Sequence, residues 1–179
     1  MTRFFTMPRL HCLTVLLGLL LPLASFASSP LDGRWRLDTS RSSALDGWSQ
    51  WDLVITTDGT RVNLQHDMQW RSTKHTATTT VDTRHSSKVA NFFRVEQRHM
   101  ALYPAKGGLT TVKAAWIDGD RTLRVEADTP IEISQGEQNM CIYSEYRLLE
   151  GDRSLLLIEL HSSRPQPLVY RFTKVTPEN

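Results

Sequence analysis

Five histidines follow residue 27, and they are the first side chains that could do chemistry, by binding a metal ion. They are His66, His75, His85, His99 and His161. No two of them are two or four residues apart, the spacings that would place both rings on one face of a strand or a helix. The sequence therefore predicts no metal site, only scattered surface histidines and one inward histidine, His66.

Nucleophilic catalysis needs an activated nucleophile with a base within reach. The sequence has neither a G-x-S-x-G nucleophile elbow nor a local Cys-His signature. Gly107-Gly108 precedes a strand-like run rather than a helix, which indicates a turn and not a phosphate-binding loop. Glu145 and Glu159 could pair across a cavity as acid and base, but we interpret them as solvent-facing charges on strands. We therefore predict no catalytic residue, no cofactor and no enzymatic activity.

The N-terminal segment, residues 1–27, has the pattern of a cleavable signal peptide. Arg3 and Arg9 precede an apolar run from Leu13 to Ala27 that contains Pro22. This run is shorter than the roughly 20 residues that span a bilayer, so we expect cleavage after Ala27 rather than a retained membrane anchor. The prediction is a secreted protein of the bacterial periplasm, whose single domain covers residues 28–179.

Removal of this segment changes the charge and the cysteine content. The 21 Lys and Arg become 19 without Arg3 and Arg9, which equals the 19 Asp and Glu. Cys12 is also lost, so Cys141 has no intramolecular disulfide partner, and we expect it to be buried and unreactive. Secretion and neutrality together argue against a nucleic-acid partner.

Strand signals dominate from Arg34 to Val175, and no window of helical length shows a 3.6-residue apolar period. Three acidic-residue–Gly pairs, at 58–59, 118–119 and 150–151, separate strand-like runs and place a glycine where a tight hairpin needs a positive φ. Strands are predicted near residues 33–38, 51–57, 60–71, 76–83, 89–97, 109–117, 121–128, 142–149, 153–161 and 167–175. Longer connections are expected at 40–50, around 85, at 103–108 and at 129–139.

Alternation within the strands indicates which face is buried. Every second residue from Val62 to Trp70 is apolar apart from His66, and the residues between them are polar. Leu168, Tyr170 and Phe172 alternate with Arg171 and Thr173 in a similar way. An antiparallel meander with one apolar face, and no helices to cover it, must close on itself. The prediction is an all-β up-and-down barrel of about eight to ten strands.

Both ends of the domain resemble a known family. The opening LDGRWRLDTSRS, with Gly33 and Trp35 in a G-x-W motif, is similar to the first strand of lipocalins and their calycin relatives, and especially to small secreted bacterial lipocalin-like domains. The closing YRFTKV resembles their last strand. The resemblance implies that Trp35 packs at the closed end of the barrel beneath an arginine from a late strand, for which Arg171 is the candidate. It also implies a cavity for a small apolar or amphipathic molecule.

The charges are unevenly spread along the neutral chain. Residues 71–98 are rich in Lys and Arg, whereas residues 118–159 are rich in Asp and Glu. One rim of the barrel could therefore be positive and face an anionic partner, although strand alternation alone also explains charges on two outer faces.

Three functional hypotheses remain open. The leading one is a monomeric binding protein that holds a small apolar or amphipathic ligand in the barrel. The second is a ligand-free interaction or inhibitor protein of the cell envelope that acts through its charged outer surface, and the third is an enzyme that uses the cavity as its active site. The candidate ligand-binding residues are Val62, Leu64, His66, Met68, Trp70, Tyr170 and Phe172.

Overall fold

A computed structural model describes residues 28–44, 49–94, 103–105, 107–133 and 135–176. The predicted signal peptide, residues 1–27, and His99 lie outside these residues. Eleven strands and two short 3-10 turns, at Thr39–Arg41 and Glu150–Asp152, make up the regular structure. The strands are β1 Gly33–Leu37, β2 Gln50–Asp58, β3 Arg61–Trp70, β4 Thr73–Asp82, β5 Ser87–Ala90, β6 Tyr103–Pro104, β7 Leu109–Ile117, β8 Thr122–Ile133, β9 Gly136–Leu148, β10 Ser154–His161 and β11 Leu168–Lys174.

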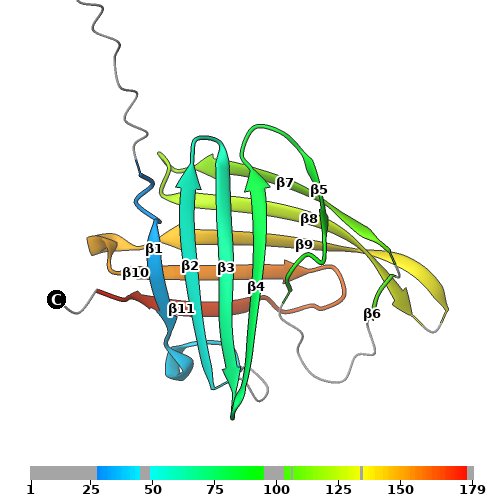
Figure 1. Ribbon diagram of the computed structural model, residues 1–179, viewed down its shortest axis with the longest axis horizontal. Helices are drawn as coiled ribbons and strands as arrows, with labels where there is room; N and C mark the ends of the chain where they lie inside the picture. Colours follow the sequence, from blue (N-terminus) through cyan, green and yellow to red (C-terminus); the bar gives the residue numbers. More distant parts are fainter. Residues whose placement is uncertain (1–27, 45–48, 95–102, 106, 134, 177–179) are drawn as a thin grey trace, which may run out of the picture.

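All paired strands are antiparallel, in the spatial order β4-β3-β2-β1-β11-β10-β9-β8-β7-β5, with β6 beside β8. β1 pairs with both β2 and β11, which joins the two ends of the meander. In Figure 1, β2–β4 cross in front of β7–β11, so the sheet wraps around a single interior. The all-β prediction is confirmed, because the chain forms a nearly closed up-and-down barrel.

The predicted hairpins are present, and their glycines have the expected backbone. Gly59, Gly119 and Gly151 have φ values of 59°, 61° and 77°. These turns hold β2 to β3, β7 to β8 and β9 to β10 in register.

Two predicted boundaries were wrong. The expected connection at 129–139 is instead strand, because β8 and β9 stay paired as far as Ile133 and Gly136. Thr129, Ile131 and Met140 keep the inward alternation through this stretch and are buried. The strand expected at 89–97 ends at Ala90, and Asn91 then adopts a positive φ of 54°; residues 95–97 lie outside the described part of the chain.

Trp35 fills one end of the barrel and is fully buried. Its Nε1 donates to the Leu31 carbonyl at 2.8 Å, which satisfies the indole inside the core. The ammonium of Lys174, the residue directly opposite on β11, lies 4.9 Å from the Trp35 ring centroid. Gly33 leaves room for this lysine, because a Cβ there would lie 3.2 Å from Lys174 Cε.

The prediction that Arg171 would cover Trp35 was therefore wrong, since Lys174 takes that place. Leu168, Tyr170 and Phe172 are buried, so even-numbered residues of β11 point inward. Arg171 has the opposite parity and belongs to the outer face, whereas Lys174 has the parity of the core.

A buried carboxylate ties β1 to β2 on the outer face. Asp52 accepts from Arg36 Nε and Nη2 at 2.9 and 2.8 Å, and from Arg34 Nη1 at 3.0 Å. Arg36, followed by Arg34, holds the pKa of Asp52 below its usual value against the opposing effect of burial. Arg34 also reaches Asp67 on β3 at 3.2 Å, so three strands share one ionic network.

We predict that Trp35→Ala lowers the free energy of unfolding by about 3–5 kcal/mol, because it removes one of the largest fully buried side chains of the core. The matched control is Trp70→Ala, because Trp70 is 47% exposed, and it should cost under about 1 kcal/mol. Urea denaturation of both variants tests the assignment, and equal losses would contradict it.

Candidate functional site

The predicted ligand-binding residues fall into two groups. Val62, Leu64, His66 and Met68 lie on the inner face of β3 and are buried, and Tyr170 and Phe172 are fully buried on β11. Trp70 differs from the prediction, because it is the last residue of β3 and almost half of it is exposed, with Arg71 5.5 Å from its ring.

Trp51, which the sequence analysis did not single out, lies among these residues. Its ring centroid is 5.1 Å from those of both Tyr170 and Phe172, in edge-to-face geometry. It also lies 6.3 Å from Phe93, which follows β5. We call Trp51, His66, Phe93, Tyr170 and Phe172 the aromatic cluster.

His66 is held inside the aromatic cluster as a neutral ring. Trp51 Nε1 donates to His66 Nδ1 at 3.2 Å, and Phe93 stacks on the imidazole with 4.1 Å between centroids. Burial lowers the pKa of His66 to about 3, which outweighs the opposing effect of Asp67. The inward histidine that the alternation predicted is therefore satisfied by protein groups, and its role here is packing.

A second inward set is polar and lies on β9 and β10. Glu159 and His161 alternate with outward residues on β10 and are only 7% and 9% exposed. Glu159 stands directly opposite Ser144, whose Oγ donates to Glu159 Oε1 at 3.4 Å. His161 Nε2 lies 3.9 Å from Glu159 Oε2. We call Ser144, Glu159 and His161 the polar cluster.

Two atoms of the polar cluster lack a hydrogen bond. Glu159 Oε2 and His161 Nε2 are both inaccessible to solvent, and neither has a hydrogen-bond partner among the residues that the structure describes. Leaving a buried polar group unpaired costs about 1–3 kcal/mol. Tyr146, also inward on β9, feels the same carboxylate, because burial and then Glu159 raise the pKa of its hydroxyl.

The polar cluster corrects two predictions. Glu159 was expected to face solvent and His161 to lie on the surface, yet both face the barrel interior. The run Leu155–Glu159 is apolar except for its last residue, so it has no alternation that could identify the inward face. The neighbouring strand β11 shows which face of β10 points inward. Its buried residues Leu168 and Tyr170 pair with Glu159 and Leu157, so Glu159 and Leu157 share the inward face.

The wall of β7 and β8 beside the polar cluster carries small side chains. Ala114, Val125 and Ala127 lie on the inward face of this wall. Thr110 and Thr129 are buried and share a hydrogen bond of 3.1 Å between their hydroxyls. Bulky side chains of β2 and β11 therefore occupy one part of the interior, and small ones line another.

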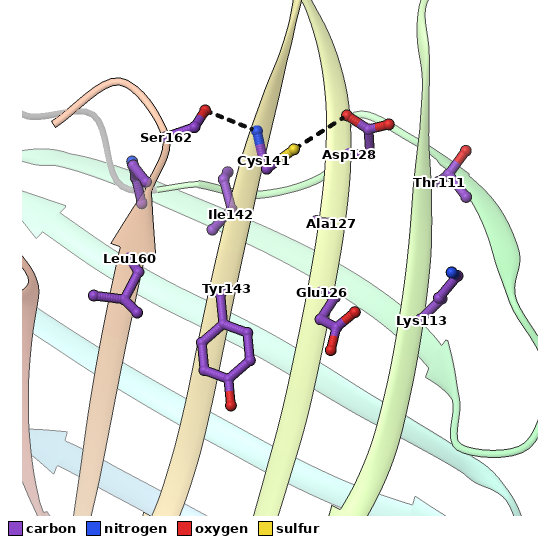
Figure 2. A pocket seen from close by; sticks show the side chains of 11 residues that line it. Thr111, Lys113, Glu126, Ala127, Asp128, Cys141, Ile142, Tyr143, Leu160 and Ser162 are labelled. Atoms are coloured by element: carbon purple, nitrogen blue, oxygen red, sulfur yellow. Dashed lines mark hydrogen bonds between the residues drawn. The ribbon is translucent and has the colours of Figure 1, made fainter.

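A groove of about 530 Å³ lies along β7–β10, and besides outward side chains it is lined by Ala127, Ile142 and His161, the last a member of the polar cluster. Lys113, Glu126, Asp128, Cys141 and Tyr143 come from three neighbouring strands and line it together (Figure 2). The groove is mixed in charge and shares no member of the aromatic cluster.

Cys141 lies in this groove and is exposed, so the prediction of a buried cysteine was wrong. Met140 and Ile142 on either side of it are buried, which fixes the outward parity of Cys141. Its Sγ is 3.7 Å from Asp128 Oδ1. Partial burial and the Asp128 carboxylate raise the pKa of the Cys141 thiol, so it is accessible but poorly ionised.

The described residues include no group of three or more His, Cys, Asp or Glu side chains arranged to hold a metal ion. No helix among them has the length and apolarity needed to cross a membrane.

We predict that His66 makes the barrel less stable in acid. The unfolded chain protonates this ring below pH 6.5, whereas the folded chain does so only near pH 3, so between these values the unfolded state binds more protons. Stability should fall by about 1.4 kcal/mol per pH unit as the pH drops through this window. Urea denaturation from pH 6.5 to 3.5 should give a shallower pH dependence for His66→Gln, and an unchanged slope would argue against a buried neutral His66.

We predict that Asp128→Asn speeds the reaction of Cys141 with Ellman's reagent at pH 7.5 a few-fold, because removing the carboxylate increases the thiolate fraction. Glu126→Gln is the matched control, since it also lines the groove but is not among the groups that shift the thiol. Equal acceleration by both variants would contradict a specific effect of Asp128.

Comparisons with known proteins support the fold. No family model matches the chain, and no curated protein matches it. Among solved structures, a secretory abundant heat soluble protein from Ramazzottius varieornatus is similar with a TM-score of 0.50 at 11% identity, covering 83% of this chain and 98% of that one.

Two other solved structures give lower scores. Secretory abundant heat soluble protein 4 of Ramazzottius varieornatus has a TM-score of 0.49 at 11% identity, over 83% of this chain and 96% of its own. A Schistosoma mansoni fatty acid binding protein in complex with arachidonic acid has a TM-score of 0.48 at 8% identity, over 83% and 98%. At 11% identity the first of these comparisons concerns architecture alone, and it agrees with the antiparallel barrel of this chain.

Proposed function

We propose that this chain is a non-catalytic binding protein that holds a small apolar or amphipathic molecule inside its barrel. The observation that carries the proposal is the polar cluster, where Glu159 Oε2 and His161 Nε2 are buried side by side without hydrogen bonds. Buried polar groups are normally paired, and the described residues offer these two atoms no hydrogen bond, so the site has room in its bonding for a group of a bound molecule. We also propose, from the pattern of residues 1–27, that the protein is secreted into the bacterial periplasm and acts there as a monomer.

The size of the barrel supports an interior ligand. Eight strands already give an interior that side chains just fill or that holds one small ligand, and the diameter grows with strand number. Here ten strands form the path around the interior. Small side chains of β7 and β8 lie beside the polar cluster, where Ala127 and His161 also line the groove of about 530 Å³, whereas the aromatic cluster is packed by its own ring contacts.

The order of groups in the polar cluster supports binding over acyl transfer. In a serine hydrolase the imidazole lies between the hydroxyl and the carboxylate and takes the proton of the nucleophile. Here the carboxylate of Glu159 lies between Ser144 and His161, and the Ser144 hydroxyl donates to that carboxylate. Ser144 therefore lacks the imidazole that takes the proton of the nucleophile in a serine hydrolase.

The second candidate function is interaction with a partner through the outer surface. The observation that favours it is the groove on β7–β10, where Leu160 is 47% exposed beside charged residues such as Lys113 and Glu126. A ligand in this groove would touch outward side chains such as Lys113 as well as Ala127 and His161, so a substitution at Lys113 is the one that separates the two candidates.

We predict that the neutral fluorescent probe N-phenyl-1-naphthylamine binds saturably, at one site per chain. Ala127→Leu places bulk inside the barrel and should weaken binding about tenfold or more, because Ala127 is buried beside the polar cluster. The matched control, Lys113→Leu on the outer face of the neighbouring strand, should leave binding within about twofold. Fluorescence titration and circular dichroism of both variants provide the measurement.

Loss of binding in Lys113→Leu would favour the outer groove, because Lys113 lines that groove with outward parity. Absence of saturable binding by the unmodified protein would contradict an interior site.

A further inference from the structure

We infer that the ligand's polar end is a hydrogen-bond donor, a hydroxyl or a primary amine, which is held between Glu159 and His161. This inference rests on the proposed function and specifies the chemistry of the same site. Its basis is the identity and the position of the two unpaired atoms, Glu159 Oε2 and His161 Nε2.

The geometry leaves one place for a bridging atom. Glu159 uses Oε1 to accept from Ser144, so Oε2 is the oxygen that remains. His161 Nε2 lies 3.9 Å from it, too far for a hydrogen bond between them. One oxygen or nitrogen at about 2.8 Å from both atoms spans this separation. Such an atom donates to the carboxylate, and a hydroxyl can at the same time accept from the imidazole.

The charge of the site disfavours an anionic head group. Glu159 is a carboxylate, and among the described residues His161 is the one basic side chain within 4.0 Å of it. Lys174 is engaged with Trp35 at the closed end of the barrel. Arg94, beyond Phe93, already has an interaction of its own. A ligand carboxylate would therefore meet a like charge in a buried site, which costs far more than in water.

The neighbours of the polar cluster fit the apolar part of an amphipathic molecule. Leu168 pairs with Glu159 and Ile142 pairs with His161 across the sheet, and both are buried. Val125 and Ala127 follow on β8 with the same inward parity. A hydroxyl or amine at the polar cluster is thus surrounded by aliphatic groups, the arrangement expected for one orienting polar contact in an apolar site.

The test is displacement of N-phenyl-1-naphthylamine by three probes that share a ten-carbon chain: decan-1-ol, decylamine and decanoate, at pH 7.5. The unmodified protein should bind the alcohol and the amine at least about tenfold more tightly than decanoate. Glu159→Gln should weaken the amine about 10- to 100-fold, because its charge-assisted hydrogen bond is lost. The same variant should also reduce the difference in affinity between decanoate and the other two probes.

Glu145→Gln is the matched control. Glu145 is on β9 and is as little exposed as Glu159, at 7%, but it is on the outer face, bonded to Tyr143 and Arg147. This variant should keep the ranking of the three probes. Because the ranking is first measured on the unmodified protein, the test does not depend on whether Glu159→Gln folds.

The outcomes separate the two proposals. If the fluorescent probe binds but decanoate displaces it as well as the alcohol and the amine do, the donor head group is overturned while interior binding stands. Equal effects of Glu159→Gln and Glu145→Gln on the binding of decylamine would also overturn the inference of a donor head group. If neither the fluorescent probe nor any ten-carbon chain binds, the proposed function itself fails, and the polar cluster then binds solvent alone.

Discussion

The pairing of β1 with β11 is the constraint on which the barrel depends. All other strand neighbours follow one another along the chain or close to it, whereas this pairing joins residues near 35 to residues near 173. It is short, with three residue pairs that run from Trp35 and Lys174 to Leu37 and Phe172. Closure by so short a strand needs support from side chains on both of its faces.

Each face of β1 supplies that support in a different way. On the inner face, Trp35 is enclosed by the core and covered by Lys174. On the outer face, Arg34 and Arg36 converge on the buried carboxylate of Asp52. A carboxylate with several charge-assisted hydrogen bonds is stabilised in its ionised form. The G-x-W opening thus combines a hydrophobic anchor with an ionic one over four residues.

Strand alternation explains how much of this architecture could be predicted from the sequence. β3 and β11 alternate cleanly, so the inward faces of Val62, Leu64 and Tyr170 were correctly identified. The all-β meander and its three acidic-residue–Gly hairpins follow from the same pattern and from glycines with positive φ.

Where alternation is missing, the prediction was wrong for a physical reason. Leu155–Glu159 has apolar residues on both faces, because the outward Leu156 and Ile158 are themselves partly covered, so the sequence could not place Glu159 inside. The cation over Trp35 depends on the register between β1 and β11, which no local pattern encodes. Trp70 fits the alternation but lies at the end of its strand, where alternation no longer implies burial.

The interior has two zones with different energetics. In the aromatic cluster the Trp51 indole and the His66 imidazole are matched, since Trp51 donates to the neutral His66 and Phe93 stacks against the imidazole. In the polar cluster, two buried atoms are left unmatched. Ring packing therefore dominates the first zone, whereas in the second zone the described residues leave two buried polar atoms without a hydrogen bond.

A comparison of Glu145 with Glu159 shows why this need is specific. The two glutamates lie on the adjacent strands β9 and β10. Glu145 pairs with Ile158 and Glu159 pairs with Ser144, and the two glutamates are equally buried. Glu145 is fully supported by a tyrosine hydroxyl and a guanidinium on its own strand. The same sheet thus provides a complete set of donors for a buried carboxylate on its outer face. On the inner face, the Ser144 hydroxyl donates to Oε1 of Glu159. The other oxygen, Oε2, lies 3.9 Å from His161 Nε2, a separation that one ligand atom can bridge.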